Sequence, residues 1–267
     1  MEGLTQAALL DPAWQWLIAF AVALARPAGM LAVNPVMTRA GLTGLLRGAV
    51  AAALALPAVP HLAGQVASGA QAPLTLLLLT AKEAVMGTVL GFLLGLPFWA
   101  FDAAGDVLDQ QRGATAGRLN DPAGFADVSI TGTLLVLTGI TLFVATGGLQ
   151  TLASLLYASW AVWPPLTAMP SPTAQAPVLL LGFLDAVLRQ GVLLGAPVVV
   201  AMLLADAALI LVGRFAPQLR IDDLAPAARN LVFCLFMPLY CVFLVGYMGR
   251  DTLALPGLLD LMQRGLQ

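Results

Sequence analysis

Charged residues are scarce in this sequence. Asp, Glu, Lys and Arg make up only 10% of the 267 residues, and Lys82 is the single lysine. A soluble domain carries about 25% charged residues, so this composition excludes an ordinary soluble fold. The formal net charge of -2 also argues against a nucleic-acid partner, because proteins that bind nucleic acids gather Lys and Arg on one surface.

Cysteine and histidine are equally rare. Cys234 and Cys241 are seven residues apart in an apolar run, which puts them on one helix face and predicts packing rather than a disulfide or a metal site. His61 is the only histidine and has no ligand cluster near it. No GxSxG, HExxH, Walker or CxxC motif occurs. We therefore expect neither a cofactor nor enzymatic activity.

Hydrophobic residues are what the sequence has in abundance. They make up 60% of the chain, and the mean hydropathy is +0.92, which together indicate an integral membrane protein. No basic region precedes the first apolar segment, so we expect that segment to be retained rather than cleaved as a signal peptide. The sequence predicts an all-α, polytopic membrane protein of bent helical hairpins, with apolar segments at residues 14–33, 42–62, 74–101, 130–156, 178–212 and 231–248.

Several of these segments carry expectations of their own. The uninterrupted apolar part of the second, residues 48–60, is shorter than the roughly 20 residues that a span needs, so we expect a hairpin arm buried against protein. The fourth contains no charge and is expected to be a plain lipid-exposed span. Residues 157–177 are expected to form an extended loop at a membrane interface, and residues 214–230 a polar connection broken by Pro217 and Pro226.

The stretch at residues 82–122 is the centre of the sequence. Gly87, Gly91 and Gly95 follow one another at a spacing of four, a pattern that lets a second helix approach closely. Ordinary helix packing and a subunit interface both explain this ladder. The apolar run then continues without a break into an acidic piece in which Asp102, Asp106 and Asp109 share one helix stripe, which Gly113 extends.

Lys82 and Glu83 stand inside this apolar stretch. A charge at bilayer depth costs about 2.5 to 3.5 kcal/mol on insertion scales and usually faces a bundle interior or a wet cavity. Adjacent residues point about 100° apart on a helix, so we expect Lys82 and Glu83 to face different partners. A helix end at the membrane surface is the other explanation.

Two further charged residues each have more than one interpretation. Arg26 is either an end residue that reaches toward water or an interior charge with a partner such as Glu83. Asp206 either pairs with Lys82 or Arg214 or lies near a helix end in water.

The acidic stripe invites a comparison with metal enzymes. Aspartate-rich helices of polytopic prenyl and phosphatidyl transferases hold Mg²⁺ and a diphosphate. Those enzymes need a second acidic cluster or a DG…AR pattern, and here Asp102 is followed by two alanines and no second cluster recurs. The sequence therefore argues against metal catalysis.

These residues also carry a family resemblance. The central stretch reads KE…G…LGF, then PFWAFDAAGDVLDQQRGAT, then DP, and it is accompanied by Arg26-Pro27, Asn34-Pro35 and RFAPQL at residues 214–219. In these features the sequence resembles the SctT/FliR family, the export-apparatus membrane subunits of type III secretion systems and of the flagellar exporter. The form AGDVLDQQRGAT at residues 104–115 is more similar to the injectisome branch (SctT, also called HrcT, YscT or SpaR). The resemblance covers nearly the whole chain in length and segment order.

The resemblance implies a non-catalytic role in the bacterial inner membrane. Members of the family join SctR-like and SctS-like subunits in a helical assembly that admits unfolded secreted proteins, beside an SctU-like switch protein and above an SctV-like export gate. That assembly is raised partly out of the bilayer toward the periplasm, and energy comes from a separate ATPase and the proton-motive force. Residues 1–177 would correspond to an SctR-like front part and residues 178–267 to an SctS-like closing hairpin.

The residues expected to contact neighbouring subunits or the passing chain are charged, amide, glycine or proline residues of the motifs above. They are Arg26, Lys82, Glu83, Gly87, Gly91, Gly95, Asp102, Gly105, Asp106, Asp109, Gln110, Gln111, Arg112, Gly113, Asp206, Arg214, Pro217 and Gln218. The alternative function is a secondary transporter or channel for a small solute, in which Lys82, Glu83, Asp206 and the acidic stripe line a pathway between broken helices.

Overall fold

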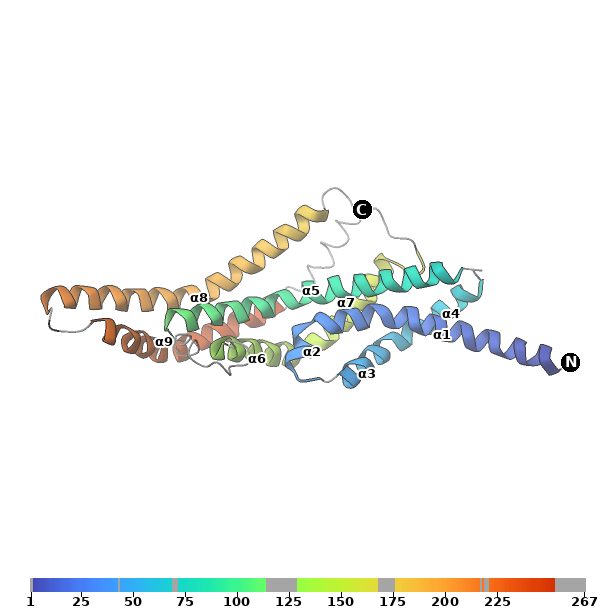
Figure 1. Cartoon of the computed structure of the whole chain (residues 1–267), viewed down its shortest axis with the longest axis horizontal. Helices are drawn as coiled ribbons and strands as arrows, with labels where there is room; N and C mark the ends of the chain where they lie inside the picture. Colours follow the sequence, from blue (N-terminus) through green and yellow to red (C-terminus); the bar gives the residue numbers. More distant parts are fainter. Residues whose placement is uncertain are drawn as a thin grey trace. The chain divides into compact units, whose positions relative to one another are not determined.

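The computed structural model describes residues 2–42, 44–68, 72–113, 129–167, 176–216, 218 and 221–252. These residues form helices without strands, so the all-α prediction is confirmed. In chain order the helices are α1 (Glu2–Val33), α2 (Pro35–Arg39), α3 (Gly44–Ala55), the short 3₁₀ helix η1 (Leu56–Ala58), α4 (Val59–Ser68), α5 (Pro73–Gln111), α6 (Ile130–Ala145), α7 (Gly148–Val162), α8 (Ala176–Phe215) and α9 (Ile221–Thr252) (Figure 1).

Five helical segments are long and apolar enough to cross a membrane, and α6 with α7 makes a sixth if that pair counts as one span. The five are Pro12–Val33, Gly44–Ala67, Pro73–Gln111, Gly191–Phe215 and Asp223–Phe243. The chain is therefore a polytopic membrane protein. The second of these segments has 24 residues, so the expectation that it is too short to span is wrong: helical residues on both sides of Pro57 extend the apolar part.

Three predicted boundaries are also wrong. The single helix expected at residues 130–156 is two helices, because Gly147 adopts a left-handed φ of 82° between α6 and α7. The loop expected from residue 157 begins later, since α7 continues to Val162. The connection expected up to residue 230 is helical from Ile221, because membrane helices tolerate a proline such as Pro226.

The described residues divide into two compact units. The first contains α1, α2, α3, η1, α4, α7 and the part of α5 that ends at Gly95. The second contains the rest of α5 from Leu96, together with α6, α8 and α9. α5 thus contributes to both units, and its helix continues from the apolar run into the acidic stripe as the sequence predicts.

In the first unit α1 packs against α3 and α4 (Figure 1). The contact surface is made of small or branched apolar side chains, among them Ala19 and Ala23 of α1, Ala55 of α3, and Val59 and Leu62 of α4. Alanine at the centre lets the helix axes come close where lipid gives no hydrophobic force for helix association.

α1 also packs against α5 through the glycine ladder. A Cβ atom at Gly87 would overlap the main chain of Arg26, and one at Gly91 would overlap the main chain of Met30. Gly29 of α1 approaches the main chain of α5 in the same way. The ladder is therefore a helix packing surface within this chain at Gly87 and Gly91, and Gly95 is buried on the same helix.

The second unit has a similar close approach. A Cβ atom at Gly105 of α5 would overlap the main chain of Gly132 in α6. Phe98 packs edge-on against Phe143 of α6, with ring centroids 5.5 Å apart. α6 contacts α9.

A core formed by Leu108 of α5 and Val198 and Met202 of α8 receives α9, through side chains that include Phe233 and Met237. The four helices α5, α6, α8 and α9 thus pack together in the second unit.

We predict that Gly91→Ala lowers stability, because the new methyl group meets the backbone of Met30 and overpacking of this kind costs about 1 to 3 kcal/mol. Gly64→Ala is the matched control, since Gly64 is also helical but no neighbouring atom lies within 4 Å of the position that a Cβ atom would take. The control should be neutral or stabilising by up to about 1 kcal/mol. Thermal unfolding in detergent measures both, and equal midpoints would contradict the close packing of α1 and α5.

Candidate functional site

A group of buried charges connects α1, α5 and the end of α7 in the first unit. Arg26 and Glu83 form a two-point ion pair, with Nε to Oε2 at 2.7 Å and Nη2 to Oε1 at 3.0 Å. Both side chains are fully buried. Arg26 also donates to the hydroxyl of Ser159 at 3.0 Å and to the carbonyl of Trp163 at 2.9 Å. We call Arg26, Lys82, Glu83 and Ser159 the Arg26 cluster.

Lys82 joins this cluster from the same helix as Glu83. Its Nζ lies 3.0 Å from Oε1 of Glu83 and donates to the carbonyls of Pro165 at 3.0 Å and Thr167 at 2.9 Å. Glu83 thus faces Arg26 and Lys82 faces main-chain carbonyls, so the two adjacent residues do have different partners, and they also contact each other. The long lysine side chain bends back toward its neighbour, because carbonyl groups just beyond the C-terminus of α7 attract a cation.

The Arg26 cluster settles two alternatives of the sequence analysis. Arg26 is an interior charge paired with Glu83, and neither Lys82 nor Glu83 marks a helix end, since α5 begins at Pro73 and continues to Gln111. Two cations share one carboxylate, and main-chain carbonyls supply the remaining negative partial charge. Such a cluster fixes the position of α7 against α1 and α5.

A second buried group lies where α5 ends and α6 begins. Asp109 is fully buried and accepts hydrogen bonds from Ser129 Oγ at 2.8 Å, the Thr131 amide at 3.1 Å and Thr131 Oγ1 at 2.5 Å. Arg112 completes it, with Nη2 at 2.6 Å from Oδ1 of Asp109. We call these four residues the Asp109 cluster.

The Asp109 cluster caps α6. Ser129 is the N-cap residue of α6, and its Oγ accepts from the Gly132 amide at 2.8 Å. The positive end of the α6 dipole therefore faces the carboxylate of Asp109, which favours its charged form. Helix capping is the role that the structure gives to Asp109.

Arginine side chains tie the end of α5 to α9. The guanidinium of Arg112 lies 4.4 Å from the ring centre of Phe233, a cation–π contact. Arg229 of α9 pairs with Asp206 of α8 at 3.0 Å and donates to the carbonyl of Gln111 at 2.8 Å. The expected partners of Asp206, Lys82 and Arg214, are thus both wrong. Sequence analysis missed Arg229 because it placed that residue in an irregular connection rather than on a helix.

The other expected site residues have simpler surroundings. Asp102 is partly exposed, and Asp106 and Gln110 are exposed on α5. No atom of the packed neighbours in this chain lies within 4 Å of the Cβ position of Gly113, and its left-handed φ of 77° ends α5. Arg214, in the last turn of α8, and Gln218 are exposed, and Pro217 lies outside the described residues.

Cys234 and Cys241 are free cysteines exposed on α9, so the packing predicted for them is not with other side chains of this chain. In the part of the chain that the structure describes, no three His, Cys, Asp or Glu side chains are placed together as metal ligands.

Comparison with known proteins matches residues 17–254 to the family described as bacterial export proteins, family 1. The chain belongs to this family. Yop proteins translocation protein T of Yersinia pestis is 33% identical to it, over 89% of this chain and 91% of the relative. Surface presentation of antigens protein SpaR of Salmonella typhimurium is 32% identical, over 82% of this chain and 81% of the relative.

A third relative is secretion system apparatus protein SsaT of Salmonella typhimurium, 32% identical over 83% of this chain and 86% of that protein. These bacterial export proteins are of the SctT type, so the resemblance to the SctT/FliR family is confirmed. The chain is a membrane protein of the type III secretion export apparatus.

We predict that Glu83→Gln strongly destabilises this SctT-type protein, because it leaves Arg26 and Lys82 buried without a counter-charge. Breaking a buried pair by removing one partner costs about 3 to 5 kcal/mol. Asp206→Asn is the control, since its pair with Arg229 is about a quarter exposed and should cost about 1 kcal/mol or less. Detergent unfolding of both variants measures the difference, and similar losses would show that burial does not set the energy.

We also predict that Asp109→Asn loosens the start of α6. The amide lacks the charge that Arg112 and the helix terminus require, and a negative charge at a helix N-terminus stabilises by about 0.3 to 2 kcal/mol. Hydrogen exchange in the first turn of α6 should become faster. The control, Asp223→Asn, changes an exposed aspartate in the first turn of α9 and should leave exchange in the first turn of α6 unchanged. Unchanged exchange in Asp109→Asn would remove the capping role.

Proposed function

We propose that this protein is a non-catalytic subunit of the type III secretion export gate in the bacterial inner membrane, where it helps to form the entry conduit for unfolded secreted proteins. Membership in the SctT-type export proteins supports this proposal. The proposal depends mainly on one observation about the buried charges. Arg26 and Glu83 pair with each other inside the chain, and this contact holds helices together. Such charges build a scaffold rather than bind a substrate.

The exposed surface of the second unit supports a role among partner proteins. Only 17% of the apolar window in Gly191–Phe215 is buried in this chain, and none of the window in Asp223–Phe243. Exposed polar groups interrupt the apolar helices, among them Asp106 and Gln110. A carboxylate that faces hydrocarbon is costly, so protein or water is the better neighbour for this surface.

The partners that fit the proposal are SctR-like and SctS-like subunits, with an SctU-like switch protein and an SctV-like export gate beside or below them. In that arrangement α8 and α9, within residues 178–267, act as the SctS-like closing hairpin, and residues 1–177 act as the SctR-like part. The assembly is raised partly toward the periplasm, so not every apolar helix needs to contact lipid.

The expected contact residues separate into two groups within this proposal. Exposed or partly exposed residues of α5 face the passing chain or a neighbouring subunit: Asp102, Asp106 and Gln110. The Arg26 cluster, the Asp109 cluster and Arg229 position the helices that present that surface. Neither group supplies a catalytic function.

The test is expression of the chain with and without the genes beside it, followed by native mass measurement and a secretion assay in a deletion strain. We predict a particle much heavier than 27.6 kDa in co-expression, poor recovery of the chain alone, and restored secretion by the wild-type gene. Asp109→Lys, which puts a cation against the N-terminus of α6, should lower both complex yield and secretion.

The competing function makes a different prediction. A solute transporter would be stable alone, and the purified chain in liposomes would move a small solute while no other apparatus subunit co-purifies. That result, together with normal secretion in the deletion strain, would overturn the export-gate proposal.

A further inference from the structure

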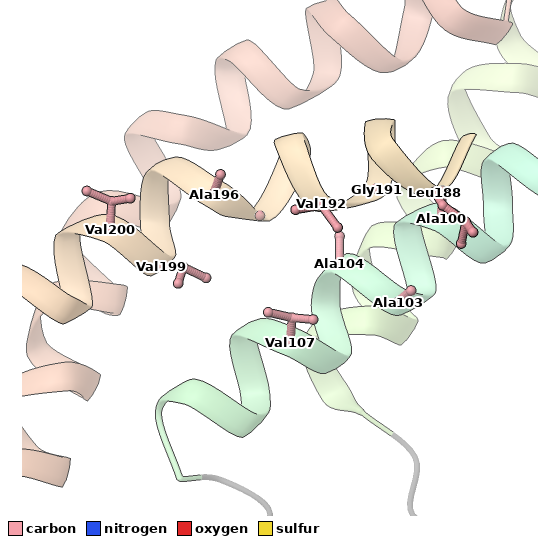
Figure 2. A pocket seen from close by; sticks show the side chains of 11 residues that line it. Ala100, Ala103, Ala104, Val107, Leu188, Gly191, Val192, Ala196, Val199 and Val200 are labelled. Atoms are coloured by element: carbon pink, nitrogen blue, oxygen red, sulfur yellow. The ribbon is translucent and has the colours of Figure 1, made fainter. Parts of the chain in front are cut away.

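The groove between α5 and α8 in the second unit is lined by apolar side chains and glycine only (Figure 2). Its small residues already pack the two helices, since the Cβ position of Gly191 is 3.0 Å from the carbonyl oxygen of Ala100. Ligand sites usually offer a few polar groups that orient the ligand. Such groups gather in the first unit instead, around the ammonium group of Lys82.

The segment that follows α7 has more hydrogen-bond acceptors than donors. The last carbonyl groups of a helix lack helical partners, and Pro164 and Pro165, which come directly after Trp163, have no N–H to donate. Thr167 satisfies the carbonyl of Pro164, through its amide at 3.3 Å and its hydroxyl at 2.8 Å. The carbonyls of Trp163, Pro165 and Thr167 accept instead from cationic side chains of α1 and α5.

Three oxygen atoms match the three N–H donors of the Lys82 ammonium group. They are Oε1 of Glu83 at 3.0 Å and the carbonyl oxygens of Pro165 at 3.0 Å and Thr167 at 2.9 Å. We call these three atoms the oxygen cage. A lysine ammonium has three donors and no acceptor, so the oxygen cage offers one acceptor to each donor.

The same geometry argues against a metal ion in the oxygen cage. Ca²⁺ takes about 6 to 8 oxygen ligands, at roughly 2.3 to 2.6 Å. The oxygen cage supplies a single carboxylate and two carbonyls, all at hydrogen-bond distance from Nζ of Lys82. One charged and two neutral acceptors therefore suit a monovalent cation with N–H donors.

The ammonium group is largely withdrawn from water. The side chain of Lys82 is 8% exposed and that of Glu83 is fully buried. The indole ring of Trp163, a residue that is 7% exposed, has its centroid 6.0 Å from Nζ and adds a cation–π attraction. Charge attraction is strong in such a dry site, because little solvent screens it.

We propose that the oxygen cage is a binding site for a primary ammonium ion, which the wild-type chain fills with its own Lys82. The lysine acts as a tethered ligand: its charge and its three donors hold the segment after α7, and its methylene groups carry the ammonium to that place. A free alkylammonium ion then occupies the oxygen cage when the side chain at position 82 is shortened. The site lies within the first unit and does not depend on the export function.

Chemical rescue of Lys82→Ala tests this site. The substitution removes the atoms from Cγ to Nζ, and n-propylammonium supplies the same atoms. In the full chain in detergent, Lys82→Ala should unfold at a lower temperature than wild type. Added n-propylammonium should recover about half or more of the lost midpoint, and the recovery should grow with its concentration, as for any ligand of the folded state. The wild-type midpoint should not rise, because Lys82 fills the site.

Three controls separate the site from general effects of salt and burial. Tetramethylammonium has the same charge but no N–H donor, so it should leave the midpoint of Lys82→Ala unchanged. Lys82→Met fills the space with an uncharged chain of similar length, so n-propylammonium should not raise its midpoint. Lys82→Arg keeps a charge and N–H donors, and should lose less stability than Lys82→Ala.

Hydrogen exchange shows whether the rescue acts at the oxygen cage. The amide of Thr167 should exchange faster in Lys82→Ala than in wild type, and n-propylammonium should slow it again. Equal effects of the two ammonium ions, or rescue of Lys82→Met as well, would overturn the proposal. Recovery of folded Lys82→Ala only when n-propylammonium is present supports the site, and no recovery at any concentration overturns it.

Discussion

An ion pair in a low-dielectric interior is the constraint on which the first unit depends. Arg26 and Glu83 stand on apolar helices, where neither could remain charged without the other. Their two-point contact determines which face of α1 meets α5. The carbonyl groups after α7 then complete the coordination of Arg26 and Lys82, so three segments far apart in the sequence are fixed by one buried carboxylate.

The glycine ladder makes that ion pair possible. Gly87 lies four residues after Glu83 on the same face of α5 and contacts the main chain of Arg26 itself. A larger residue there would hold α1 away and lengthen the distance between guanidinium and carboxylate. Backbone contact and charge pairing therefore act together: small residues bring the helices close, and the charges make their register specific.

The second unit also combines a close backbone contact with a buried charge, but with different residues. Gly105 brings α5 against α6, and one turn later Asp109 caps the α6 terminus that this contact places beside it. Arg112 and Arg229 extend the network to α9. Asp109 is buried in this junction, whereas Asp106, on the same helix, stays exposed.

The sequence alone determined the membrane class, the helical content, the family and the candidate residues. Composition and hydropathy act along the chain, and the motif around residues 104–115 is specific enough to name the export family. The sequence also suggested Glu83 as a partner for Arg26, since it contains few counter-charges.

Only the tertiary structure decided which charges meet. The pairing of Asp206 with Arg229 required knowing that residues 221–252 are helical, and the meeting of Lys82 with Glu83 required the carbonyls beyond α7. The division of the acidic stripe into a buried cap at Asp109 and an exposed face at Asp106 followed from α6, which the helical period of α5 cannot reveal. Helical periodicity and composition indicate which side chains share a helix face, whereas the free energy of burying a charge depends on what packs against that face.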